Sequence, residues 1–350
     1  METVFTAELE PFLNAVAGRM SLYVPKKVGE HYVYSRYDAE AACPVEFSNI
    51  RTCTPVKEYL FPLQELAAVF PDPVEPPEIK PFAVFGLKDC DLRSIEVLDK
   101  VFLEDEFKDP FYVARRDNMF IISTDCFDPA ESCFCNILGG GPFPQKGFDL
   151  NLSQVEGGFL VEVGSKKGQE FVANNAQLFT APPEDAVEQR DKIRAEAKST
   201  LEKQNARLEW EKPIGRMMHE TRDSQVYDEE AKSCVECQAC TRVCPTCHCF
   251  FLYDTKQADY FGKMKMWDSC MRMSYAAVAG GENPRKLLGG RLRHRLMHKF
   301  AYFFDRYGID MCVGCGRCID AESGAVDIRR VLNKLSEELR DKKKKAKVAR

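Results

Sequence analysis

The residues best suited to chemistry in this sequence are its cysteines, 16 among 350 residues. Twelve lie in three tight groups, and the other four stand apart at positions 43, 53, 90 and 270. The groups are Cys126, Cys133 and Cys135; Cys234, Cys237, Cys240, Cys244, Cys247 and Cys249; and Cys312, Cys315 and Cys318. The first residues, "METVFTAELEPFLNAV", are acidic and lack a basic stretch before an apolar one, so we expect no signal peptide. In a chain that is not exported, clustered cysteines more often bind metal or do redox chemistry than form disulfides.

The stretch "CVECQACTRVCP" at 234–245 fits the run C-x2-C-x2-C-x3-C-P. This spacing lets one short loop wrap a [4Fe–4S] cube, while the last cysteine turns away to a second cluster. A zinc site would use paired C-x2-C units around one ion, which does not explain three evenly spaced cysteines followed by Cys-Pro. We therefore predict four cluster ligands here: Cys234, Cys237, Cys240 and Cys244.

The second motif, "CVGCGRCIDAESG", contains Cys312, Cys315 and Cys318, but the fourth place is occupied by Glu322 and a serine stands where the proline would be. In two-cluster ferredoxins the fourth cysteine of each run ligates the other cluster. Cys244 therefore completes the cluster of the second motif. The irregular ligand belongs to the cluster of the first motif, although it is visible only in the second.

Three hypotheses for that irregular position remain open. Glu322 can ligate through oxygen, a harder donor than thiolate that would change the reduction potential. Cys247, Cys249 or Cys270 can replace the missing thiolate. Alternatively, the fourth iron is absent or bound by water.

The first half of the chain shows the pattern of an α/β domain with a parallel β-α-β core. Residues 82–87 and 119–124 are short apolar runs typical of buried strands, and 91–102 between them has apolar residues at helical spacing. A further strand is predicted at 159–165. Residues 184–210 follow two prolines and carry an apolar stripe on a charged background, which predicts a long amphipathic helix.

Cysteines follow both predicted parallel strands. Cys90 comes after the first strand and Cys126 after the second, with Cys133 and Cys135 in the loop beyond. Because the carboxyl ends of parallel strands form one edge where ligand crevices occur, these four thiols can converge there. We predict a third iron–sulfur cluster on them. The alternative is that Cys90 and Cys126 are core thiols, because cysteine is among the most buried residue types.

These observations predict three parts of the chain. Residues 1–225 form the α/β domain and end after the long helix. Residues 226–335 form an α-rich, dicluster ferredoxin-like domain. Residues 336–350 are basic and too poor in apolar residues to pack, so we expect a disordered tail.

The composition also excludes several classes of function. A net charge of −5 and a pI near 5.8 give no reason to expect nucleic-acid binding. No 18-residue apolar run is present, so we expect no membrane span. The glycines at 139–141 do not form a dinucleotide fingerprint, so we expect no flavin or NAD on this chain. The basic stretch 285–300 is interpreted as charge compensation for anionic clusters, or as a packed helix.

In combination these segments closely resemble one family. The quoted residues "GLKDCDL", "DCFDPAESCFCNILGGGP", "CVECQACTRVCPTCHCF", "WDSCM", "RLRHRLMHKF" and "MCVGCGRCID" are similar to those of the A-subunit family of anaerobic sulfite reductases. That family includes beta subunits of cytoplasmic NiFe sulfhydrogenases. The resemblance spans roughly residues 80–335, and it departs from the family at Glu322, where relatives have Cys-Pro.

The resemblance implies a cytoplasmic electron-transfer subunit with no catalytic residue of its own. One expected partner is a flavin-containing, NAD(P)H-reactive subunit. The other is a catalytic redox subunit of the sulfite reductase, NiFe hydrogenase or heterodisulfide reductase type. Two other interpretations are kept. One is a catalytic reductase that binds substrate at an incompletely ligated cluster near Glu322, and the other is a structural zinc protein.

Overall fold

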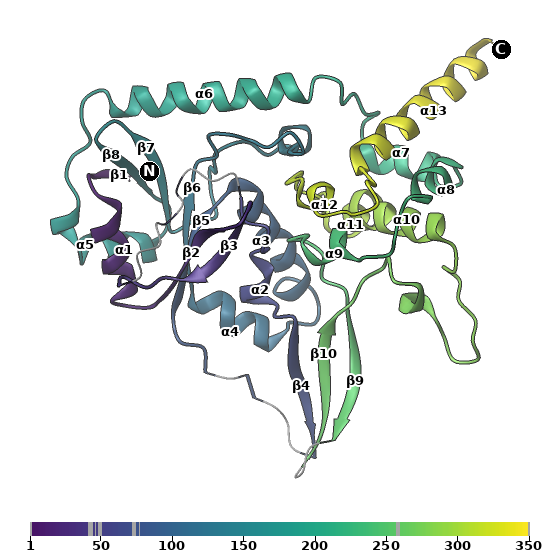
Figure 1. Ribbon diagram of the computed structural model, residues 1–350, viewed down its shortest axis with the longest axis horizontal. Coiled ribbons are helices and arrows are strands. Elements are labelled where there is room, and N and C mark those ends of the chain that lie inside the picture. The colour runs from purple at the N-terminus through teal and green to yellow at the C-terminus, as the bar shows by residue number, and fades with distance from the viewer. Residues whose placement is uncertain are drawn as a thin grey trace. The chain divides into compact units, whose positions relative to one another are not determined.

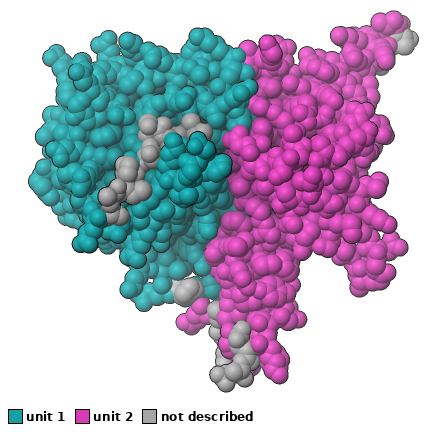
Figure 2. Space-filling view, in the orientation of Figure 1, with its two compact units in different colours: residues 1–60, 76–204 teal, residues 61–75, 205–350 magenta. Residues whose placement is uncertain are grey.

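The computed structural model describes residues 2–40, 45, 47, 51–71, 75–76, 78–256 and 260–348. The chain forms two compact units, coloured separately in Figure 2. Unit 1 comprises residues 1–60 and 76–204, and unit 2 comprises residues 61–75 and 205–350. The division differs from the predicted boundary at 225 in two ways: unit 2 begins at residue 205, directly after the long helix, and the segment 61–75 supplies a strand to it.

Unit 1 is built around a seven-stranded sheet with the order β1-β8-β7-β6-β5-β2-β3 (Figure 1). Its strands are β1 (Glu2–Thr6), β2 (Ser21–Val28), β3 (His31–Arg36), β5 (Phe82–Leu87), β6 (Met119–Thr124), β7 (Leu150–Val155) and β8 (Gly158–Val163). The four central strands, β2, β5, β6 and β7, run parallel, and the outer pairings are antiparallel. The predicted parallel α/β core is thus confirmed within a mixed sheet.

Helices connect and cover these strands. They are α1 (Leu9–Ala17), α2 (Lys57–Leu60), α3 (Asp89–Phe102), α4 (Pro110–Asn118), α5 (Lys166–Ala173) and α6 (Ala186–Gln204). Both β5 and β6 are buried along their whole length, as central parallel strands covered on two faces must be. The helix α3 begins where the Asp91 carboxylate accepts a hydrogen bond from the Lys88 backbone N–H at 3.1 Å.

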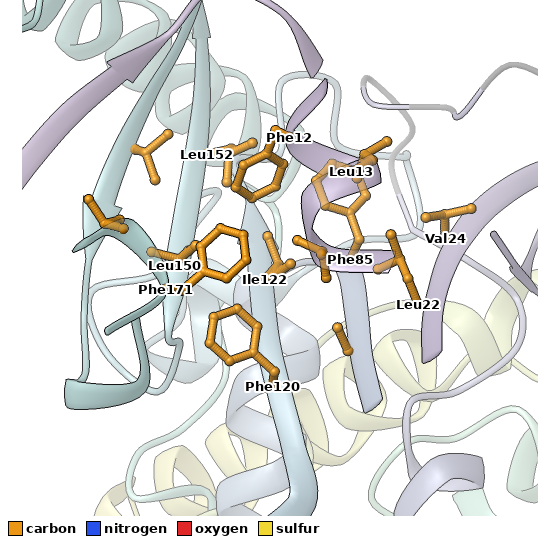
Figure 3. Packing of buried hydrophobic residues seen from close by; sticks show 14 of the residues in the cluster. Phe12, Leu13, Leu22, Val24, Phe85, Phe120, Ile122, Leu150, Leu152 and Phe171 are labelled. Atoms are coloured by element: carbon orange, nitrogen blue, oxygen red, sulfur yellow. The ribbon is translucent and has the colours of Figure 1, made fainter. Parts of the chain in front are cut away.

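The main core of unit 1 lies between the sheet and the helices α1 and α5 (Figure 3). Phe12 of α1 and Phe171 of α5 meet edge to face, with ring centroids 5.8 Å apart. Alternate residues such as Phe85 and Ile122 project from the strands into the same cluster. Burying each such side chain stabilises the fold by roughly 1.5–3 kcal/mol. This cluster therefore stabilises the sheet of unit 1.

Unit 2 combines short helices with a three-stranded antiparallel sheet of order β4-β10-β9. The strands are β4 (Gln64–Phe70), β9 (Phe250–Lys256) and β10 (Phe261–Trp267). The helices are α7 (Ile214–Glu220), α8 (Val226–Ala231), α9 (Ala239–Arg242), α10 (Leu288–Met297), the π-helix η4 (His298–Tyr302), α11 (Phe303–Tyr307), α12 (Arg317–Asp320) and α13 (Ile328–Val348). The α-rich prediction lacked this sheet, whose β9–β10 hairpin lies within residues 226–335 and whose β4 comes from a segment far away in sequence.

The C-terminal region also differs from the predicted disordered tail. The helix α13 continues through it to Val348. Its first half buries Val331, Leu335 and Leu339 on one face, which anchors the helix. The lysine-rich second half extends this helix as an exposed segment, since lysine is a good helix former.

Candidate functional site

Four cysteines of unit 1 lie together at the carboxyl edge of the parallel strands. Cys90 lies in the first turn of α3, directly after β5, and Cys126 follows the end of β6. Cys133 and Cys135 come from the next loop, where Cys135 opens a short 3-10 helix, Cys135–Leu138. Burial raises the pKa of Cys126 to about 11 and raises that of Cys135 too, and neighbouring thiol charges add to both rises. The structure thus brings together the thiols that we predicted for a third cluster.

The buried cation Lys88 faces this group. Its Nζ donates to Thr124 Oγ1 at 2.8 Å and to the Asp125 carbonyl at 2.9 Å. Burial lowers the pKa of this ammonium, and the nearby charges of Cys126 and Cys90 act in the opposite direction. A desolvated cation is stabilised by an anion beside it, so the thiols and Lys88 suit an anionic group.

The helix α6 supports the loop that carries these cysteines. Arg194 Nε donates to Asp125 Oδ2 at 2.7 Å, which holds the residue before Cys126. Gln204 Nε2 donates to the Cys133 carbonyl at 2.9 Å, and Leu201 packs against the Cys133 side chain. The helix itself was predicted from its apolar stripe. Its role beside the thiols was not, because that contact joins segments about 70 residues apart.

The cysteines of the second motif lie with Cys244 in unit 2. Burial raises the pKa of Cys312 and of Cys318 to about 12, and the charges of Cys244 and Cys315 add to both rises. Gly314 has φ 68°, a left-handed turn that directs its N–H to the Cys312 sulfur. The charges of these four thiols therefore act on one another within unit 2, and their role as ligands of one cluster stays a prediction.

The cysteines of the first motif lie with Glu322. Burial raises the pKa of Cys234 and of Cys240, and the charges of Cys237 and Glu322 add to both rises. The Glu322 side chain is 9% exposed, and its Oε2 accepts a hydrogen bond from the Val326 N–H at 2.7 Å. The charge of Glu322, one of the candidate replacement ligands, thus acts directly on this motif's thiols.

The loop of the first motif carries local strain. Glu236 and Gln238 adopt φ values of 55° and 63°, in the left-handed region that favours glycine. Each such residue costs on the order of 1 kcal/mol or more and persists only where its surroundings determine the conformation. The packing around this loop therefore determines the conformation that spaces Cys234, Cys237 and Cys240.

The other three candidate ligands form a fourth thiol group. Cys247 and Cys249 precede β9, and Cys270 follows β10. The thiols of Cys249 and Cys270 are hydrogen bonded to each other, and the charge of Cys247 acts on Cys270. Tyr275 Oη donates to Cys249 Sγ at 3.8 Å.

Two buried cations from α10 and η4 lie among the cluster thiols. Arg295 and Lys299 are each 2% exposed. Lys299 Nζ lies 3.2 Å from Cys244 Sγ, and no described residue is a hydrogen-bond partner for Arg295 Nε or Nη2. Burial lowers the pKa of Arg295, but the charges of Cys240 and Cys318 outweigh it and hold the pKa well above its usual value. Buried cations beside thiols need anions, so the residues present fit anionic iron–sulfur clusters.

Two features are absent from the part of the chain that the structure describes. None of the described helices combines the length and apolar character needed to cross a membrane. Among the same residues, no three or more His, Cys, Asp or Glu are arranged to hold a single metal ion.

Comparison with known proteins identifies the family. A model of the 4Fe-4S dicluster domain matches residues 233–326. The chain is 37% identical over 263 residues to the sulfhydrogenase 2 subunit beta of Pyrococcus furiosus, an alignment that covers 74% of this chain and 75% of the relative. The match to a 4Fe-4S domain favours iron–sulfur binding over a zinc site. The chain therefore belongs to the family of anaerobic sulfite reductase A subunits and sulfhydrogenase beta subunits, which are iron–sulfur electron-transfer proteins.

Proposed function

We propose that this chain is a relay that passes single electrons between a flavin-containing, NAD(P)H-reactive partner and a catalytic redox subunit. The observation that carries the proposal is that the thiols of unit 1, of the first motif and of the second motif each lie beside a buried cation. The sequence has no dinucleotide fingerprint. When bound, an iron–sulfur cube accepts or gives up one electron with little rearrangement. The sulfhydrogenase relative favours a hydrogenase-type catalytic partner, and sulfite reductase and heterodisulfide reductase types are the other classes proposed.

Two clusters are assigned to unit 2. The second-motif cluster is held by Cys312, Cys315, Cys318 and Cys244. The first-motif cluster is held by Cys234, Cys237, Cys240 and Glu322. The support for this assignment is electrostatic proximity within each set, together with the buried cations between them.

A third cluster is assigned to unit 1. Its proposed ligands are Cys90, Cys126, Cys133 and Cys135 at the carboxyl edge of the sheet. Lys88 offsets the charge of this group from within the core, and α6 holds the loop around it. This third site would lengthen the electron path beyond the dicluster domain.

The chain's own residues set the properties of these sites. Arg295 and Lys299 are charged and buried, so they favour the more negative, reduced state of a neighbouring cluster and raise its potential. The Val326 N–H fixes one oxygen of Glu322 and orients the carboxylate toward the thiols of the first motif. These residues tune electron transfer and catalyse no step.

A catalytic reductase is the second candidate, because a small cavity beside Glu322 is lined by Cys234, Cys240 and Arg295. The two functions differ in turnover. We expect the purified, anaerobic chain to oxidise reduced methyl viologen stoichiometrically, by about three electrons if three cubes are present. Continued viologen oxidation on adding sulfite would contradict the relay and support the reductase.

Glu322 can be tested directly as a ligand. We expect Glu322→Ala to lose about one iron per chain and to give a three-iron EPR signal, since a cube needs a ligand at each iron. Glu322→Cys is the matched control and should retain all irons with a changed potential. If neither variant alters the EPR spectrum or the potential, Glu322 is not a ligand.

We also propose a cytoplasmic location. None of the 15 cysteines that the structure describes forms a disulfide, as expected in a reducing compartment.

A further inference from the structure

Three thiols of unit 2 remain outside the two proposed cluster sites. Cys247 and Cys249 precede β9 and Cys270 follows β10, so all three come from the end of one antiparallel hairpin. The Asp268 N–H donates to the Cys249 carbonyl at 2.8 Å, which extends the ladder beyond the strands. This backbone pairing holds Cys249 and Cys270 close together.

The contact between Cys249 and Cys270 is direct. Their thiols share a hydrogen bond, and Tyr275 Oη donates to Cys249 Sγ at 3.8 Å. Cys270 is 6% exposed, whereas Cys249 is half-buried and reaches solvent. The bond from Cys270 is the largest influence on Cys249 and lowers the pKa of its thiol. An accessible thiol of lowered pKa beside a buried second thiol is the arrangement of a reversible dithiol.

The pair lies close to both proposed clusters of unit 2. The charge of Arg295 acts on Cys270 and also on Cys240 and Cys318, one ligand from each cluster. Lys299 acts in the same way on the other thiol of the pair and on the second-motif thiols. One buried cationic segment therefore acts electrostatically on the pair and on both clusters.

We propose that Cys249 and Cys270 form a redox-active dithiol that exchanges two electrons with the neighbouring clusters. On oxidation both S–H bonds break and one S–S bond forms between the two sulfurs. Two protons leave to solvent on the side of Cys249, and two electrons pass, one to each of two oxidised cubes. Reduction reverses every step. The inference rests on the proposed clusters as one-electron partners, and it gives the relay a place to store an electron pair.

The test is a thiol titration of the anaerobically prepared full chain. Samples are poised across the range in which EPR shows the clusters passing from fully reduced to fully oxidised. They are then quenched with N-ethylmaleimide in denaturant, which exposes the buried Cys270, and mapped by mass spectrometry. We expect Cys249 and Cys270 to lose labelling together, at least tenfold, along a two-electron curve, with a cross-linked peptide appearing. Cys53, which is exposed, is the control and should label at every potential.

Variants complete the test. In Cys249→Ser, Cys270 should label at all potentials while the cluster EPR signals are unchanged. Both thiols of the unaltered chain labelling throughout the range would overturn the proposal, as would a disulfide from Cys270 to Cys247. Loss of about four irons from Cys249→Ser or Cys270→Ser would also overturn it, because the thiols would then be cluster ligands. The iron count of the unaltered chain, measured on the same samples, separates failure of the dithiol from failure of the proposed clusters.

Discussion

The thiol site of unit 1 and the thiol sites of unit 2 are built on different supports. In unit 1 the cysteines follow the fully buried strands β5 and β6, which have a core of their own. In unit 2 Cys240 lies in α9 and Cys318 in α12, helices of four residues each, and the other motif cysteines lie in the adjoining loops. Helices that short are not stable by themselves, so their shape depends on tertiary contacts. We therefore expect the site of unit 1 to be formed without a cluster, and the two sites of unit 2 to depend on bound clusters for their shape.

The buried lysines of the two units also differ in how much negative charge surrounds them. Burial lowers the pKa of Lys88 in unit 1 despite the thiols beside it. Burial also acts to lower the pKa of Lys299 in unit 2, but the combined charges of Cys244, Cys247 and Cys312 hold it well above its usual value. Unit 2 concentrates more opposite charge in one buried volume, so losing its anionic clusters should harm it more.

Removing iron and sulfide should have the largest effect. We expect amide exchange over 234–244 and 312–320 to accelerate on the order of 100-fold, because their order depends on metal binding. Exchange over 82–87 and 119–124 should change less than about twofold, since those strands belong to a packed sheet. Hydrogen-exchange mass spectrometry of the full chain measures both. An equal increase in amide exchange in both regions would show that the two units do not differ in their dependence on metal.

Replacing a single proposed ligand should have the next largest effect, and it should affect the stability of the two units differently. Cys318→Ala and Cys126→Ala should each lose about four irons, but only Cys318→Ala should destabilise its unit, by about 3 kcal/mol or more, by leaving Arg295 uncompensated. Both tryptophans, Trp210 and Trp267, lie in unit 2, so their fluorescence follows its unfolding. Cys53→Ala is the control. A similar loss of stability in Cys126→Ala would contradict the account.

Neutralising Lys299 should shift a potential without removing a cluster. A unit charge about 6 Å away at an effective dielectric constant of about 20 is worth about 3 kcal/mol, or about 100 mV for one electron. Lys299→Met should therefore lower the potential of the second-motif cluster by about that amount, because the reduced state loses a cation. Lys299→Arg keeps the charge and should shift the potential little. Redox titration followed by EPR gives the values, and an unchanged potential in Lys299→Met at full iron content would refute the role.

The smallest expected effect is on acid stability. Burial, aided by the charge of Arg285, lowers the pKa of His294 to about 4, and its ring lies near Tyr275 and His298. The folded state then binds fewer protons than the unfolded state, so stability falls as the pH drops below about 6.5 and levels off near 4. His294→Gln should flatten this dependence and raise Tm at pH 5 by about 3 °C, after allowing for solvent screening.

Thermal unfolding followed by circular dichroism measures this change, with pH 7.5 as the internal control. An identical pH profile in the variant would show that His294 does not contribute. If the variant raised the Tm of unit 1 by the same amount, the acid sensitivity would not be local to α10.

Much of the fold could be predicted where the signal is local. Residues 82–87 and 119–124 are continuous apolar runs, and α3 carries an apolar stripe at helical spacing, so these elements were predicted correctly. The helix predicted over 184–210 is present as α6, but it ends at Gln204 and its Val187 is exposed. The strand β4 was missed as part of unit 2, because its pairing of Gln64 with Met266 spans 202 residues and leaves no local pattern. Lysine content suggested a disordered tail, but the buried first half of α13 nucleates the helix that continues through it.

The site follows the same division. Cysteine spacing and the ligand-swapping rule placed Cys244 with the second motif and Glu322 with the first, and in the structure the charges of these two residues act on the thiols of those motifs. Sequence charge suggested compensation in the basic stretch, but only the fold shows that Arg291, Arg295 and Lys299 are buried and that Arg295 and Lys299 act on the motif thiols. The Cys249–Cys270 pair could not be predicted, because the β9–β10 hairpin is what joins the two residues.

We propose three [4Fe–4S] clusters in this chain, one on the sheet of unit 1 and two among the loops and buried cations of unit 2. Iron and acid-labile sulfide analysis with EPR, on the anaerobically prepared full chain, tests it most directly. The account predicts about 12 irons and about 12 sulfides per chain, with three reducible centres. About eight irons would remove either the cluster of unit 1 or the first-motif cluster, and zinc without sulfide would contradict the whole account.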